Sequence, residues 1–140
     1  MADQVPVERG KIREFAKATG SKNPDYDKAD APVTPTFLTT AGNFWRTGTH
    51  PTAQLGFELA RILHGEEEYE FFGPPPHAGQ TLTFESRLGE QWEKEGKRGG
   101  VMRFAKLITE FRDESGTLVA EQRTTIIETG KAPVSSGSER

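Results

Sequence analysis

The stretch Thr34-Pro35-Thr36-Phe37-Leu38-Thr39-Thr40-Ala41-Gly42-Asn43-Phe44-Trp45-Arg46 decides the fold class of this 140-residue chain. Its apolar residues form an almost continuous stripe at helical spacing, which predicts a buried helix over 35–46. The Thr34 hydroxyl can cap free N–H groups, and Pro35 suits the first helical position. We expect this helix to be the central helix around which a sheet wraps. The stripe consists of Phe37, Leu38, Ala41, Phe44 and Trp45.

Downstream of this stretch the hydrophobic period changes. Residues 52–63 still carry apolar side chains at helical spacing, and we expect a second helix or an irregular helical segment that ends at His64-Gly65. The remaining chain alternates between polar and apolar residues and is divided by turn signals. Helices followed by a strand meander indicate an α+β fold with a sheet of about five antiparallel strands. Strands are expected at 67–72, 81–88, 101–112 and 117–128.

Upstream, one apolar face at helical spacing predicts a helix from about Glu8 to Thr19, with Gly20 as its natural C-cap. Asn23-Pro24-Asp25 is a turn signal, and residues 21–33 are expected to form a loop. We therefore expect one domain over residues 1–130. The Ser/Gly-rich segment 131–140 has the composition of a disordered polar tail.

Composition excludes several classes of protein. The net charge of −3 provides no basic field for nucleic acid. No apolar run approaches the roughly 20 residues of a membrane helix, and the first residues lack a secretion pattern. The absence of cysteine excludes disulfides and thiolate metal sites, and the three histidines lack a recognised metal-ligand spacing. We expect a cytoplasmic protein without a metal site.

Several segments together resemble the MaoC-like dehydratase family, in its N-terminal dehydratase domain type. The resemblance covers roughly residues 7–129, and Gln80 stands where the family's Pro-x-x-Gly-Asp-x-Leu turn has Asp. It implies a hot-dog fold, in which an antiparallel sheet wraps around one helix and two such units pair into a double hot dog. It also implies addition of water to acyl thioesters, or its removal from them. The segments that carry the resemblance are 7–16, 20–26, 31–37, 63–71, 76–82 and 111–119.

The acid/base pair of this family is missing. Active members have an Asp two residues before the Asn of the Asn-Pro turn and a His two residues after its Pro, where this chain has Ser21 and Tyr26. Hydration needs a base to activate water and an acid to protonate the α-carbon. A serine is no carboxylate base, and tyrosine phenols ordinarily titrate at about pH 10. The adjacent Asp25 should point elsewhere. We therefore expect no catalytic residues in this chain.

The resemblance then implies a particular role: the non-catalytic subunit of a heterodimeric 3-hydroxyacyl-thioester dehydratase or enoyl-CoA hydratase. Its partner would be a catalytic hot-dog subunit, in a heterodimer or heterotetramer. Its substrate would be an acyl thioester of coenzyme A or acyl-carrier protein, with no cofactor. The residues expected to contact substrate are Asn23, Pro35, Thr36, Phe37, Phe44, Trp45 and His64.

Simpler interpretations stay open for several of these residues. The aromatic side chains can be ordinary core, and His64 can end a helix and satisfy a backbone carbonyl. Lys94, Lys97 and Arg98 at a hairpin tip can meet the phosphates of coenzyme A or an acidic carrier, or form a solvated tip.

Two other functions also remain. One is a stand-alone homodimeric protein that binds acyl thioesters without catalysis. The other, less favoured, is a thioesterase, because such enzymes usually need a carboxylate near the hot-dog helix and residues 35–46 contain none.

Overall fold

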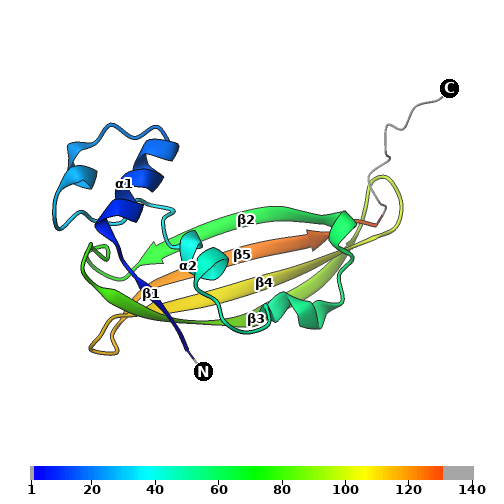
Figure 1. Cartoon of the computed structure of the whole chain (residues 1–140). Helices are drawn as coiled ribbons and strands as arrows, with labels where there is room; N and C mark the ends of the chain where they lie inside the picture. Colours follow the sequence, from blue (N-terminus) through cyan, green and yellow to red (C-terminus); the bar gives the residue numbers. More distant parts are fainter. Residues whose placement is uncertain (1, 131–140) are drawn as a thin grey trace.

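The computed structural model describes residues 2–130 and contains a long curved sheet with a few short helices (Figure 1). The segment 131–140, for which a disordered tail is expected, lies outside the described residues. The elements follow the chain as β1 Asp3–Pro6, α1 Arg9–Ala18, the 3-10 helix η1 Pro24–Asp27, α2 Thr39–Phe44, the 3-10 helices η2 Pro51–Leu55 and η3 Leu59–Arg61, β2 Ile62–Phe71, β3 Thr81–Glu95, β4 Val101–Arg112 and β5 Leu118–Glu128.

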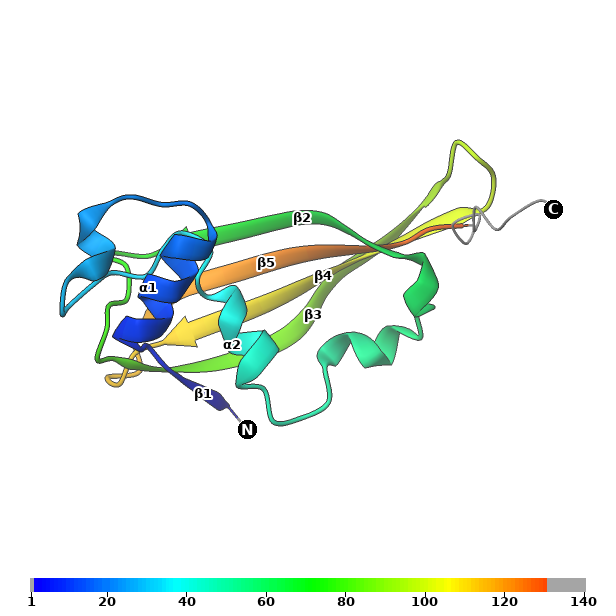
Figure 2. The ribbon, with the colours of Figure 1, turned by 45° about the horizontal axis from the view of Figure 1, so that its top comes forward.

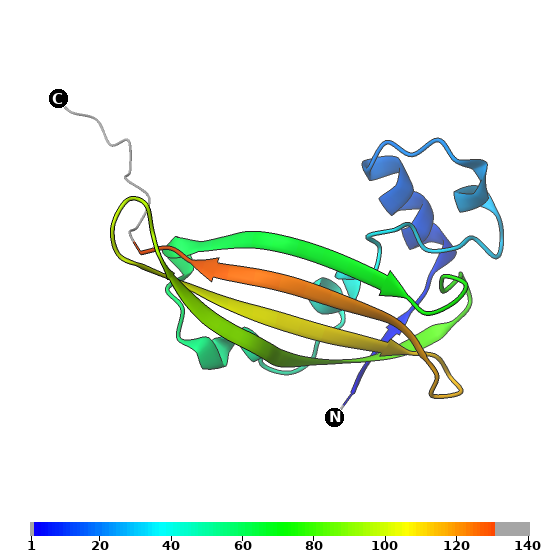
Figure 3. The ribbon, with the colours of Figure 1, turned by 180° about the vertical axis from the view of Figure 1, so that it is seen from behind.

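The five strands form one antiparallel sheet in the order β1-β3-β4-β5-β2. Strands β3, β4 and β5 are the expected meander, and β2 closes the far side of β5 as an edge strand. Both α1 and α2 lie on one side of the sheet (Figure 2). The opposite face is seen from behind in Figure 3. The predicted α+β class, the antiparallel sheet and the hot-dog arrangement are confirmed.

The core lies between α2 and the part of the sheet nearest β1. Phe37 and Leu38 are each 1% exposed and pack with Phe84 and Phe111 from the sheet. Phe15 from α1 meets Phe37 edge to face, with ring centroids 5.8 Å apart. Burial of a phenylalanine side chain stabilises a fold by about 1.5–3 kcal/mol, so this cluster accounts for the position of both helices.

The central helix is shorter than the sequence predicts. It begins at Thr39, and residues 35–38 form tight turns with hydrogen bonds from Phe37 N to Thr34 O and from Thr39 N to Thr36 O. These bonds span three residues, as in a 3-10 helix. Thr34 is buried and caps nothing; its Oγ1 has no hydrogen-bond partner among the described residues.

The predicted apolar stripe is also only partly buried. Phe44 is 68% exposed and Trp45 is 40% exposed, whereas Phe37, Leu38 and Ala41 are covered. A six-residue helix that rests on a sheet buries one side, and Phe44 and Trp45 at its end lie off that side.

The region after α2 corrects a second prediction. Residues 51–61 form the irregular alternative, as η2 and η3, but the segment does not continue to His64. Strand β2 already begins at Ile62, so His64 is a strand residue and ends no helix. Strand β1 was not predicted, because four residues are too few for a periodic signal.

Candidate functional site

An open groove lies where the loop after α1 meets the start of the α2 segment and the end of β2. It has a volume of about 570 Å³ and a mostly apolar surface. Three of the residues singled out in the sequence, Tyr26, Pro35 and Thr36, come together there. This groove is the candidate binding site. Its lining consists of Tyr26, Pro32, Val33, Pro35, Thr36, Tyr69, Phe71 and Pro75.

The Asn-Pro turn positions Tyr26. Gly20 takes the left-handed conformation expected of a C-cap, with φ of 76°. The Ser21 hydroxyl then accepts a hydrogen bond from Asn23 N at 3.3 Å, and the Asn23 side chain accepts one from Asp25 N at 3.0 Å. These bonds start η1, from which Tyr26 packs against the core. Ser21 and Asn23 are exposed and do not line the groove.

Asp25 offers no replacement for the missing carboxylate. Its side chain forms an ion pair with Lys28 at 2.7 Å, and both groups are largely exposed. The residue is also absent from the groove lining. Asp25 therefore points away from the site, as expected.

A polar cluster adjoins the groove at Tyr69. The Tyr69 hydroxyl accepts a hydrogen bond from Gln122 Nε2 at 3.2 Å, and Gln122 also bonds to the carboxylate of Glu67. Burial raises the pKa of Tyr69, and the negative charge of Glu67 adds to this, against the effect of a hydrogen bond with Thr39. The phenol is therefore protonated at neutral pH and can donate a hydrogen bond.

Glu67 and His64 share the helix-bearing face of the sheet. In the register of β2 with β5, Tyr69 lies opposite Gln122, Glu67 opposite Thr124 and His64 opposite Ile126. Residues directly opposite one another project from the same face, and alternate residues of β5 do so too. A bulge between His64 and Glu66 keeps His64 on this face. His64 itself is exposed and lies outside the groove lining.

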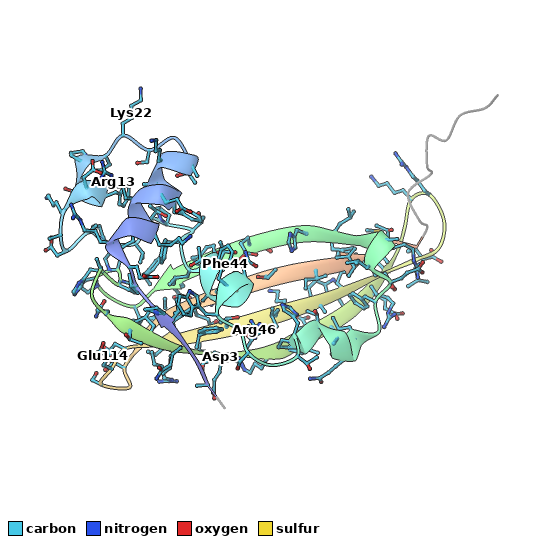
Figure 4. The ribbon with its side chains drawn as sticks, viewed as in Figure 1. Asp3, Arg13, Lys22, Phe44, Arg46 and Glu114 are labelled. Carbon is cyan, nitrogen blue, oxygen red and sulfur yellow. The ribbon has the colours of Figure 1, made fainter. Side chains whose placement is uncertain are left out.

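The remaining predicted substrate residues are dispersed. Phe37 is core, so its ring is not part of the groove surface. Phe44 projects from α2 (Figure 4), and the Lys11 ammonium lies 5.3 Å from the centre of its ring. Just beyond α2, Arg46 donates a hydrogen bond to Ser86 at 3.0 Å, which ties the end of this segment to the sheet.

The cationic hairpin tip lies far from the groove. Lys97 and Arg98 are exposed in the turn between β3 and β4, and Lys94 stacks over the Phe104 ring at 5.5 Å. Figure 1 shows this hairpin at the opposite end of the sheet from η1. These cations therefore do not adjoin the groove of their own chain.

Sequence reasoning missed Tyr69 and Pro75 among the groove residues, although Phe71 on the same strand is one of the aromatic side chains that could line an acyl tunnel. Glu67, Tyr69 and Phe71 alternate along the strand on the helix-bearing face of the sheet, and Pro75 follows in the next turn. The alternation in 67–72 was the available signal, because it places these three side chains on one face. It did not show that this face would meet the start of the helix.

Other kinds of site are limited within residues 2–130. No group of three His, Asp or Glu side chains there could hold a metal ion. None of the helices in this range is long and apolar enough to cross a membrane.

A curved antiparallel sheet around a short helix, with an apolar groove beside the start of that helix, defines a hot-dog protein. The chain belongs to the MaoC-like dehydratases, because the family model described as "FAS1-like, dehydratase domain region" matches residues 1–122. A UPF0336 protein of Parafrankia sp. (strain EAN1pec) is 32% identical over 144 residues, which cover 92% of this chain and 89% of that protein.

Solved structures share the fold. The C-terminally truncated HadBC (3R-hydroxyacyl-ACP dehydratase) complex from Mycobacterium tuberculosis matches with a TM-score of 0.69 and 21% identity, covering 89% of this chain and 90% of that one. The ChsH1-ChsH2 complex from the same organism matches with a TM-score of 0.74 and 16% identity, covering 99% and 86%. Identities this low establish a common architecture only.

Proposed function

We propose that this chain is the non-catalytic, acyl-chain-binding subunit of a hydro-lyase that acts on acyl thioesters. It pairs with a catalytic hot-dog subunit, which supplies the acid and the base. The reaction is hydration of an enoyl thioester or dehydration of a 3-hydroxyacyl thioester, with coenzyme A or acyl-carrier protein as the carrier. No cofactor is part of the proposal.

The observation that carries the proposal is the chemistry of the groove. Its lining, within the described part of the chain, contains two phenols and a hydroxyl but no carboxylate or imidazole. The position of the family His is held by Tyr26, which packs as part of the wall, and the position of the family Asp is held by the exposed Ser21. Such a site can bind an acyl chain but lacks the groups that move protons.

Two further observations support the role of a binding subunit. The groove volume of about 570 Å³ falls within the range of about 300–1,000 Å³ that is usual for ligand pockets. The HadBC and ChsH1-ChsH2 structures are complexes, so chains of this fold occur in assemblies with other subunits. The free edge of β2 offers a place for such pairing.

Co-expression with a hot-dog partner that has an intact Asp-x-Asn-Pro-x-His motif tests the proposal. The purified complex should hydrate crotonyl or longer enoyl thioesters, and this chain alone should not exceed the rate of a protein-free blank. An active isolated chain would contradict it, as would a complex with no more activity than the partner alone.

A groove variant tests the binding role separately. Thr36→Trp should raise the KM of the complex for long-chain substrates more than for crotonyl substrates, because the indole fills the groove. Asn43→Trp, on the exposed side of α2, is the matched control. Equal effects of both variants on the KM for both substrates would show that the groove does not bind the acyl chain.

A second candidate function is favoured by Glu67. Its carboxylate lies beside the protonated Tyr69 on the helix-bearing face of the sheet, so the carboxylate that the helix itself lacks is available from the sheet. Among the alternative functions, this arrangement favours a thioesterase over a protein that only binds acyl thioesters. Release of free thiol from an acyl thioester by the isolated chain, lost in Glu67→Gln and retained in Glu66→Gln, would support it.

A further inference from the structure

The free edge of the sheet is strongly acidic. Within residues 2–130, strand β2 bonds only to β5, so its outer row of backbone N–H and C=O groups has no described strand beside it (Figure 3). This edge carries the run Glu66-Glu67-Glu68-Tyr69-Glu70. An open edge of ten residues is a template for pairing with another strand, and its charge decides which strand can pair.

The protein neutralises this edge only in part. Arg123 on β5 bonds to Glu68, to Glu70 at 2.9 Å and to Glu121 at 2.5 Å, so one guanidinium faces three carboxylates. Hydrogen bonding from Arg123 lowers the pKa of Glu68, so that carboxylate is ionised at neutral pH. Glu66 has no ion-pair partner within residues 2–130. The edge therefore stays negative.

A second copy of this chain would meet this charge at its own edge. In a two-fold antiparallel pair, a register centred on Glu68 sets Glu68 against its counterpart and Glu66 against Glu70. A register centred on Glu67 sets Glu67 against its counterpart and Glu66 against Glu68. Like charges placed directly opposite each other destabilise a strand pair. Self-pairing in the middle of β2 is therefore disfavoured.

The acidic side chains are not spread evenly over the two faces. Glu68 lies opposite Arg123 and Glu70 opposite Glu121, and Glu66 follows the same alternation, so these three project from the face away from α2. Glu67 alone projects toward the helix side. A complementary strand would present cations at alternating positions on the outer face.

We infer that β2 is a charge-selective edge. It pairs with a different hot-dog chain whose edge strand carries Lys or Arg on its outer face. Pairing of β2 with a second copy of this chain is disfavoured by charge repulsion. The inference rests on the pairing in the proposed function and adds the chemistry of the partner. A homodimer through β2 is the alternative that the test must exclude.

Neutralisation of the β2 edge tests whether its negative charge prevents self-association of this chain. The triple variant Glu66→Gln, Glu68→Gln, Glu70→Gln should tighten self-association by about tenfold or more, because three like-charged positions are removed. Sedimentation equilibrium at low and high salt measures this, with added salt expected to favour self-association of the wild type only. The control triple Glu8→Gln, Glu93→Gln, Glu95→Gln removes the same charge from exposed sites elsewhere.

Charge reversal on the β2 edge tests whether opposite charge selects the partner, with a variant of this chain serving as the basic partner. Glu66→Lys, Glu68→Lys, Glu70→Lys mixed with the wild type should give a mixed dimer by native mass spectrometry, in preference to either homodimer. A wild type that dimerises tightly at low salt and is unaffected by the glutamine triple would overturn the inference, as would the absence of mixed dimers. Hydration by a complex with a partner of acidic edge would overturn it too, yet leave the proposed function intact.

Discussion

Ser21 and Tyr26 hold positions of catalytic groups but have structural contacts of their own. Ser21 receives a hydrogen bond from Asn23 N, and its own backbone N–H bonds to Ala16 O at 2.9 Å. Tyr26 packs its ring on the core at the wall of the groove. Neither contact requires proton transfer. At the scale of single residues, the proposed function therefore treats the loop after α1 as a wall of the groove and not as a catalytic loop.

This interpretation predicts that Ser21→Ala and Tyr26→Phe leave the activity of the complex within about threefold of the wild type, because loss of a true general acid or base removes roughly 10²–10⁴-fold. The Phe substitution keeps the ring that packs on the core. Initial rates of enoyl-thioester hydration measure the effect, with circular dichroism as the control for folding. A loss above a hundredfold in a folded variant would mean that these residues form a divergent active site.

Glu128 predicts a pH dependence of stability. It is 3% exposed, accepts a hydrogen bond from Glu58 N at 2.6 Å, and pairs with Arg103 at 3.2 Å and Arg61 at 3.4 Å. The hydrogen bond from Glu58 N, together with the two arginines, lowers the pKa of this carboxyl despite its burial. Its ionised form is thus favoured in the folded state, so its contribution is present above the ordinary pKa and lost as pH falls through the lowered one.

Glu128→Gln should therefore lower the free energy of unfolding at pH 7 by about 1–3 kcal/mol, the usual cost of disturbing buried charged hydrogen bonds. The difference from the wild type should shrink as the pH falls below about 4.5, the ordinary range of glutamate. Urea unfolding at several pH values measures both, with the exposed Glu93→Gln as the control. A difference that is constant with pH would contradict the assigned role.

At the scale of elements, the segment that contains α2 packs against the sheet on one side and is exposed on the other. Its buried side supplies Phe37 and Leu38 from the turns before it and Ala41 from the helix itself. Its other side, with Phe44, faces outward. Two phenylalanines seven residues apart thus have opposite roles, although the sequence places both on one stripe.

Phe37→Ala should destabilise the isolated chain by about 3–5 kcal/mol, because it leaves a cavity in a packed core. Phe44→Ala should change stability by about 0.5 kcal/mol or less, as substitutions on the surface usually do. Guanidinium unfolding followed by tryptophan fluorescence measures both. Similar losses for the two variants would mean that Phe44 is covered in solution, and self-association of the isolated chain would then need to be measured.

The sequence predicts the sheet better than the helices because the two signals differ in length. Strands β3, β4 and β5 are each longer than ten residues, and the turns that bound them carry Gly, Pro and Asp signals. The start of α2 depends on whether Thr34 caps a helix or becomes buried, and packing against the sheet decides this. Of the residues predicted to contact substrate, Pro35 and Thr36 line the groove. Tyr26 was singled out only as the replacement of the family His, and Tyr69 joins the lining through long-range pairing that no local pattern specifies.

At the scale of the whole molecule, one sheet separates two different surfaces. The helix side holds the core and the groove, while the edge formed by β2 is open and acidic. The groove lies at the end of β2 that carries Tyr69 and Phe71, so a partner strand along this edge would adjoin the groove. In the proposed function, pairing along this edge would extend the sheet and place the partner's acid and base beside the groove.

Continuation of the sheet across β2 makes a prediction for hydrogen exchange. In the isolated chain the outward amide hydrogens of β2, about half of the strand, should exchange quickly, because alternate N–H groups of an edge strand have no partner. In the complex with a catalytic partner they should slow by at least about tenfold, as buried strand amides do. Amides of β4, which already pair on both sides, should change little and serve as the internal control. Slowing confined to β1 or to the outer face of the sheet, with β2 unchanged, would show that the partner binds elsewhere and that the expected double hot dog does not form through this edge.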